Sequence, residues 1–352
     1  MPDNVVIVGA GMVTAVGLSA AETAASVRSG TARFAESSIL DKQFEPFVLA
    51  EVPEEGLPEL SEEVARAALT AREARMIRLA TVALAGCLKS LPEGEPPPGL
   101  SLALPETETT RPLRHEEFLK HLLEQTGGRF DAKWSDASHR GRAGGLNAIG
   151  QASELIRRGR AKFMLAGGVD TYRDLYVLGT LDMEKRVKSR ANLDGFIPGE
   201  AAAFLLLADR GAASGAGLAP WGSVSVVAQT TEPGHLYSEE PYRGDGLAQA
   251  VQQLAQLGAL VGPIQEVYSS MNGENHWAKE WGVTRIRGNG TFSAEHGMHH
   301  PADCYGDTGA ASGPLMTGLA ALGLREGYRA APALVYASSD QGQRAALAVS
   351  AA

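Results

Sequence analysis

The stretch GGLNAIGQA at residues 144–152 decides the fold, because it leads a cluster of small residues into a helix and then into the apolar strand FMLA at residues 163–166. The same order returns later in the chain. GAASG at residues 309–313 enters a second helix, and the strand ALVY follows at residues 333–336. Each strand closes on an acidic turn. This internal repeat predicts two similar α/β halves that pack with two small-residue helices buried between their sheets.

The repeat also predicts where the chain divides. Residues 209–217 are dominated by Gly, Ala and Ser, a composition typical of a connection. We therefore expect an N-terminal half at residues 1–210 and a C-terminal half at residues 211–352.

Composition excludes several classes of protein. The 352 residues are 44% hydrophobic and 21% charged, enough apolar surface for a large core. The net charge of −9 disfavours nucleic acid or an anionic membrane as a partner. Neither a signal peptide nor a run of about 20 apolar residues is visible, so we expect no membrane insertion and a cytoplasmic location. The two cysteines do not have the sequence spacing of metal ligands, and we expect both to be free thiols.

Local patterns predict three elements near the N-terminus. The β-branched run at residues 5–8 reads as a buried strand that enters a turn at Gly9 and Gly11. A dinucleotide site is disfavoured, because Thr14 stands where its third glycine would be. A capping pattern at Ser19 predicts a helix up to about Gly30, and helical spacing predicts one long helix over residues 62–91.

Four segments together resemble the β-ketoacyl synthases of the thiolase superfamily. They are VVIVGAGMVTAVG at 5–17, AIGQASELIRRG at 148–159 with MLAGG at 164–168, DGFIPGEAAA at 194–203, and YGDTGAASGP at 305–314. The resemblance covers most of the chain in the right order. It implies the thiolase fold, in which two βαβ-type halves form a five-layer αβαβα sandwich.

The resemblance also implies three catalytic positions, and at each of them this sequence has a residue type different from the one the family uses. Family members use a cysteine at the start of a buried helix, where the helix dipole favours a thiolate. That position falls on Arg142, whose guanidinium has no lone pair for attack on a thioester. The two partner positions fall on Asn272 and Asp307. We therefore expect no catalytic residues, no cofactor and no metal, and residues 338–343 replace the family's glycine-rich gate.

Arginine at the positive end of a helix is unfavourable unless an acid lies close to it. We therefore predict that Arg142 pairs with Asp307 or with Glu274 and closes the former pocket. The alternative is that the alignment slips by one or two residues and that Arg142 points to solvent.

A rearranged nucleophile is a second possibility. Cys304 follows His299, His300 and Asp303, an arrangement that could activate a thiol, with His300 as its partner. A cysteine packed beneath a loop is the commoner case. The neighbouring histidines match no familiar zinc spacing.

Residues after Asn272 are candidates for binding. Trp277 and Trp281 are four residues apart on a predicted helix, and they could belong to the core or to a contact surface. Glu274 and His276 precede them, and we group these four side chains as candidate binding residues.

The segments NGENHWAKEW at 272–281 and HPADCYGD at 300–307 resemble divergent synthase-like proteins of bacterial type VI secretion effector clusters. That resemblance implies a non-catalytic adaptor or accessory protein with a protein partner, and the fold implies a homodimer. Two alternatives remain open. One is an acyl-thioester transferase or ketoacyl synthase-type enzyme with a rearranged site, and the other is an inactive partner subunit of an active synthase.

Overall fold

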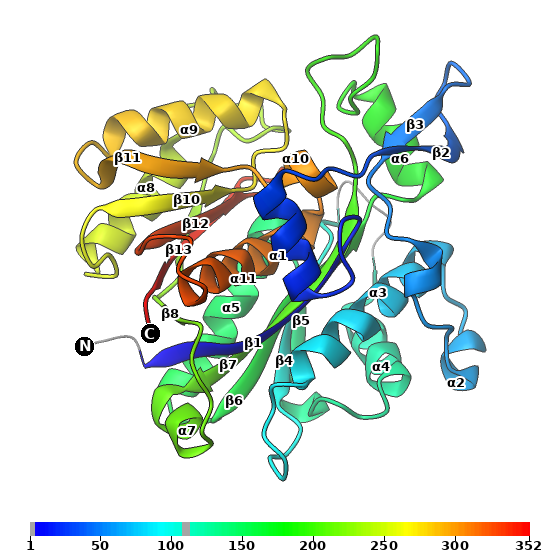
Figure 1. The fold of residues 1–352 in the computed structure, drawn as a ribbon. Helices are drawn as coiled ribbons and strands as arrows, with labels where there is room; N and C mark the ends of the chain where they lie inside the picture. The colour runs from blue at the N-terminus through cyan, green and yellow to red at the C-terminus, as the bar shows by residue number, and fades with distance from the viewer. Residues whose placement is uncertain (1–3, 108–112) are drawn as a thin grey trace.

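The computed structural model describes residues 4–107 and 113–352 (Figure 1). Its strands are β1 (Val5–Thr14), β2 (Ala35–Leu40), β3 (Pro46–Leu49), β4 (Gly99–Leu104), β5 (Asp136–His139), β6 (Phe163–Thr171), β7 (Glu200–Asp209), β8 (Gly222–Val224), β9 (Ala228–Thr231), β10 (Ile264–Ser269), β11 (Phe292–His299), β12 (Ala333–Ser338) and β13 (Gln343–Ser350). Within the described residues, eleven strands join in one sheet of order β11-β10-β12-β13-β8-β1-β7-β6-β4-β5, with β9 beside β13. Strands β2 and β3 form a separate hairpin.

Helices cover both faces of this sheet and fill its middle. They are α1 (Ala20–Ser29), α2 (Glu62–Ala65), α3 (Ala71–Leu88), α4 (His115–Gln125), α5 (Gly141–Arg157), α6 (Leu175–Met183), α7 (Arg210–Gly215), α8 (Asp245–Gln256), α9 (Asn275–Arg287), α10 (Ala302–Tyr305) and α11 (Ser312–Arg325). Short 3-10 turns lie at Glu54–Gly56, Ala132–Trp134 and Gly309–Ala311.

Alternate residues of each strand face different layers, as strand geometry requires. On β1, Ile7 packs into the central core with α5 and α11, whereas Val6 packs into an outer core under α3 and α4. On β13, Leu347 faces the central core and Ala346 faces a second outer core under α8 and α9. The order of layers is therefore α3/α4, half-sheet, α5/α11, half-sheet, α8/α9 (Figure 1).

Small residues at the start of α5 and α11 let the two central helices touch. A Cβ on Gly145 would lie 2.3 Å from Cδ of Pro314, and a Cβ on Gly313 would lie 2.7 Å from the backbone N of Leu146. Any larger residue would force the helices apart, which explains the repeated small-residue clusters. The division at residue 210 remains a prediction.

The turn predicted at Gly9 and Gly11 is wrong, because β1 continues through both glycines to Thr14. A register shift between Ile7 and Gly9 bends the strand instead. At Gly11 a Cβ would lie 1.8 Å from the carbonyl O of Ala83, so glycine is required for α3 to rest directly on the strand. The glycines serve close packing and not a turn.

The predicted helix over residues 62–91 is also wrong in extent, because the chain forms α2 and α3 with a break between them. Thr70 interrupts the helix and caps α3: its hydroxyl accepts from the backbone N of Glu73 at 3.1 Å, and the Glu73 carboxylate accepts from the backbone N of Thr70 at 2.7 Å. This reciprocal capping box starts a new helix. The helix predicted from Ser19 to Gly30 is confirmed, with Ser19 as its N-cap and Gly30 in the left-handed region.

Among the described residues, no helix is long and apolar enough to cross a membrane.

Gly11→Ala is expected to lower the free energy of unfolding by about 1–3 kcal/mol, because the added methyl group must displace the backbone of α3. Urea titration followed by circular dichroism measures the change. Gly179→Ala on α6 is the matched control, since a Cβ there meets nothing within 4 Å and alanine favours the helix. Equal destabilisation by both variants would contradict this account.

Candidate functional site

The candidate site lies at the N-terminus of α5, where the half-sheets meet. Gly141 begins the helix with φ +56°, and a Cβ there would lie 2.7 Å from the Glu106 side chain. Glycine therefore allows a tight turn from β5 into α5. The turn carries Arg142 into the interior, where the residue is only 2% exposed. The alternative alignment, with Arg142 in solvent, is wrong.

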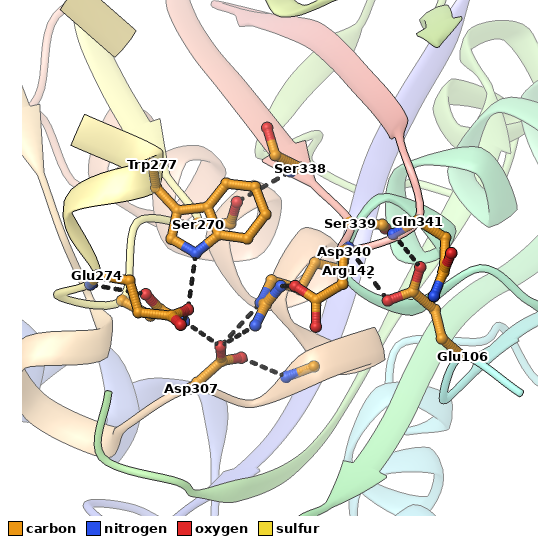
Figure 2. A network of polar contacts seen from close by, with 12 residues as sticks. Glu106, Arg142, Ser270, Glu274, Trp277, Asp307, Ser338, Ser339, Asp340 and Gln341 are labelled. Carbon is orange, nitrogen blue, oxygen red and sulfur yellow. Dashed lines mark hydrogen bonds and ion pairs between the residues drawn. The ribbon is translucent and has the colours of Figure 1, made fainter. Parts of the chain in front are cut away.

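Arg142 is bound by two carboxylates (Figure 2). Its Nε donates to Oδ2 of Asp307 at 2.8 Å, and its Nη2 lies 2.6 Å from the same oxygen. Its Nη1 donates to Oδ1 of Asp340 at 2.6 Å. The predicted pairing of Arg142 with Asp307 is confirmed. Burial alone would lower the pKa of Arg142, but Asp307 and Asp340 raise it well above its ordinary value.

The three positions that the family resemblance singles out come together in space. Asn272, in the loop after β10, donates from Nδ2 to Oδ2 of Asp307 at 2.7 Å, so this oxygen binds both Arg142 and Asn272. Asp307 Oδ1 accepts from the backbone N of Gly309 at 2.9 Å. The Asp307 carboxylate therefore has partners on both oxygens.

Glu274, the other predicted partner, pairs with a different arginine. Nε and Nη2 of Arg186 donate to the two Glu274 oxygens at 2.8 and 2.9 Å, a bidentate arrangement. Asn272 Nδ2 also lies 3.1 Å from Oε2 of Glu274 and so links this pair to Asp307. The direct contact of Arg142 with Glu274 is not found, and that option is wrong.

Asp340 joins the two arginines. Its Oδ2 accepts from Nη1 of Arg186 at 2.7 Å, while its Oδ1 binds Arg142. Burial alone would raise the pKa of Asp340, but the two guanidiniums hold it well below its usual range. We call Arg142, Arg186, Glu274, Asp307 and Asp340 the ionic network.

Sequence reasoning missed Arg186 and gave Asp340 no role in binding. Arg186 lies in the basic run KRVKSR at residues 185–190, which has the composition of a solvated loop, and nothing in that run marks one side chain as buried. Asp340 had a signal, because it closes the second strand of the repeat as Asp170 closes the first. Asp170 is likewise buried against an arginine, with Nη2 of Arg72 at 2.9 Å.

Glu106 supports the loop that carries Asp340. Its two oxygens accept from the backbone N of Asp340 at 3.2 Å and of Gln341 at 3.1 Å. Burial raises the pKa of Glu106 to about 7, and the nearby Asp340 carboxylate adds to the effect while Arg142 opposes it. Sequence reasoning missed Glu106 as well, since it follows a strand with no motif around it.

Of the two tryptophans, Trp277 faces the ionic network. Its Nε1 donates to Oε2 of Glu274 at 3.0 Å, and the Arg142 guanidinium lies 5.3 Å from its ring centroid. Trp281 stacks on Tyr336 with ring centroids 5.2 Å apart and packs against an outer core. His276 packs on Tyr242 at 4.3 Å. A binding role for these residues remains a prediction.

Cys304 lies in α10 and is buried, which raises the pKa of its thiol, with Asp303 adding to the effect. Nδ1 of His300 lies 2.8 Å from Oγ of Ser269. These surroundings favour the neutral thiol over the thiolate that a nucleophile needs. A role for Cys304 with His300 remains a prediction.

The chemistry open to the ionic network is binding and positioning. Each of its carboxylates accepts hydrogen bonds from a guanidinium that stays protonated. Within the described ranges, no group of three or more His, Cys, Asp or Glu side chains is placed to hold a metal ion.

Comparison with known proteins identifies the fold. The model of the β-ketoacyl synthase N-terminal domain matches residues 141–213, from the start of α5 to α7. No curated protein sequence matches the chain.

Three solved structures are similar over nearly their whole length. A ketosynthase complex titled "AntDE:AntF (apo): type II PKS acyl-carrier protein in complex with its ketosynthase bound to the hexaketide" has a TM-score of 0.79 at 15% identity, with 100% of both chains covered. The ishigamide ketosynthase/chain length factor has a TM-score of 0.75 at 16% identity, with 99% of both covered. A ketosynthase in complex with its chain length factor from Xenorhabdus doucetiae has a TM-score of 0.78 at 15% identity, covering 100% of this chain and 99% of that one. The predicted thiolase-like ketosynthase fold is confirmed.

Arg142→Ala is expected to lower the free energy of unfolding by about 3–5 kcal/mol, because it leaves the buried Asp307 and Asp340 carboxylates without their shared cation. Chemical denaturation measures the loss. Arg158→Ala at the C-cap of α5 is the control: its pair with Glu154 is exposed and is worth about 0.5 kcal/mol or less. A loss below about 1 kcal/mol for Arg142→Ala would contradict the network.

Glu106→Gln is expected to flatten the dependence of stability on pH. The pKa of Glu106 in the folded protein, about 7, is well above the pKa of a glutamate in the unfolded chain. The stabilisation that comes from protonated Glu106 is therefore fully present below about pH 4 and is lost as the pH rises through 7. The loss amounts to about 3 kcal/mol. Between pH 4.5 and pH 8.5, the free energy of unfolding should fall more steeply with rising pH in the wild type than in the variant. Parallel curves would refute the assignment.

Proposed function

We propose that this protein is a non-catalytic member of the ketosynthase-fold proteins and acts by binding a protein partner. The observation that carries the proposal is Arg142, held by Asp307 and Asp340 at the helix start where a ketosynthase-type enzyme would place its nucleophile. A protonated guanidinium cannot form an acyl-enzyme. The surrounding acids are the right partners for a cation and the wrong ones for a thiolate, since they would repel it.

Exposed apolar side chains support a protein partner. On α6, Leu175, Tyr176 and Met183 are 67%, 61% and 71% exposed, and Leu193 in the following loop is 77% exposed. Large exposed apolar groups that gather on one element mark contact surfaces. The exposed Lys185, Lys188 and Arg190 lie between Met183 and Leu193 in the sequence, so this surface suits an acidic, partly apolar partner.

The similar structures include ketosynthases in complex with a chain length factor and one with an acyl-carrier protein. Those complexes favour, for this chain, an inactive subunit beside an active synthase. The adaptor of a type VI secretion effector is the other partner class, and it rests on the segments at residues 272–281 and 300–307. The inactive-subunit role predicts a heterodimer, whereas the adaptor role is compatible with a homodimer.

The protein isolated from its own cells is expected to give a native mass that contains one stoichiometric protein partner, and a denatured mass equal to the unmodified chain. Purified protein is expected to show no condensation of acyl with malonyl thioesters, because Arg142 replaces the nucleophile. The identity of the partner separates an active synthase from a secretion effector.

The same masses test the enzyme alternative. A covalent acyl increment on the chain, or turnover that Cys304→Ala abolishes, would overturn the non-catalytic role. Arg158→Ala, a change of an exposed side chain at the C-cap of α5, serves as the control for both measurements.

A further inference from the structure

A cavity of about 230 Å³ is lined by residues of α1, α10 and the connection that follows α11, and none of the ionic network lines it. Its lining includes Arg28, Tyr268, His299, His300, Cys304 and Arg329. Neither the ionic network nor the proposed partner surface on α6 uses these side chains.

Two guanidiniums reach this cavity without an acidic partner. Arg28 lies 4.8 Å and Arg329 5.7 Å from the ring centroid of Tyr328, so one aromatic ring supports both. In residues 4–107 and 113–352, neither forms an ion pair, although other arginines of this acidic chain do so repeatedly. Nε of Arg329 is buried and has no hydrogen-bond partner. Buried donors of this kind are normally satisfied by a ligand or by ordered water.

The other polar groups of the cavity fit the same chemistry. His300 uses Nδ1 toward Ser269, which leaves its Nε2 as a further polar atom. His299 binds Glu266 through Nε2 at 2.6 Å, so this carboxylate is already engaged. Asp303 is the one acid among the lining residues described, whereas two guanidiniums that stay charged line the same cavity.

We propose that this cavity binds a small tetrahedral oxyanion, namely phosphate or the phosphate end of a phosphomonoester. The planar guanidinium presents a fork of donors that matches phosphate oxygens, and charge-assisted hydrogen bonds of this kind are the strong ones. A cavity of about 230 Å³ accommodates the phosphate group.

Titration calorimetry of the full chain with inorganic phosphate at constant ionic strength tests this proposal. Arg329→Gln is expected to weaken phosphate binding at least tenfold, and Arg28→Gln is expected to weaken it in the same direction. The matched control is Arg325→Gln. Arg325 also stacks on an aromatic ring, that of Trp221 at 4.9 Å, but it lies outside the cavity, and its variant should bind phosphate as the wild type does.

Glycerol 3-phosphate and acetate complete the experiment. Tighter binding of glycerol 3-phosphate than of inorganic phosphate would support the phosphomonoester form of the site, and equal binding would support the free ion. Acetate binding as tight as that of phosphate would overturn the tetrahedral selectivity. No measurable phosphate binding, or an equal loss in Arg325→Gln and Arg329→Gln, would overturn the site itself. Circular dichroism of each variant verifies that the fold is intact.

Discussion

Asp340 lies between two guanidiniums, Arg142 at the start of α5 and Arg186 after α6, and the arrangement of the candidate site depends on this contact. The half-sheets meet through a short ladder, in which only Val6 and Ile7 of β1 pair with β8. The contacts between the buried helices α5 and α11, together with the ionic network, therefore hold the halves together beyond the short β1–β8 ladder. Because Asp340 belongs to the turn after β12 and Arg142 to α5, the network fixes the position of one half against the other.

Such a network is stable only when it is complete. A buried guanidinium or carboxylate loses its hydration, and only close partners of opposite charge compensate for that loss. Both oxygens of the Asp307 carboxylate have hydrogen-bond partners. One oxygen accepts from Arg142 and Asn272, and the other accepts from a backbone N–H. A second buried pair, Arg344 with Glu280, also lies near Trp277, whose ring centroid is 5.5 Å from the Arg344 guanidinium. Trp277 thus lies near the guanidiniums of both buried ion pairs.

The parts of the fold that the sequence predicts are those set by local pattern. The clusters of small residues, each followed by a helix and a strand, predict the repeat. An arginine at a helix start requires an acid nearby, and this requirement predicts the pairing of Arg142 with Asp307. Arg186 could not be found in this way, because its burial depends on Glu274 and Asp340, which are distant in sequence. The turn at Gly9 and Gly11 was wrongly predicted because that prediction used residue type alone. The need for glycine at position 11 comes from a contact with Ala83, which is distant in sequence and lies on α3.

The start of α5 carries a buried cation, and the consequences extend beyond one residue. The positive end of the α5 dipole opposes Arg142, so the position tolerates arginine only because Asp307 and Asp340 supply negative charge. Those acids would in turn raise the pKa of any cysteine placed there and disfavour its thiolate. A cysteine introduced at residue 142 would therefore face two carboxylates that have lost their shared cation. Arg142, Asp307 and Asp340 thus depend on one another, and together they form a buried charged core at the start of α5.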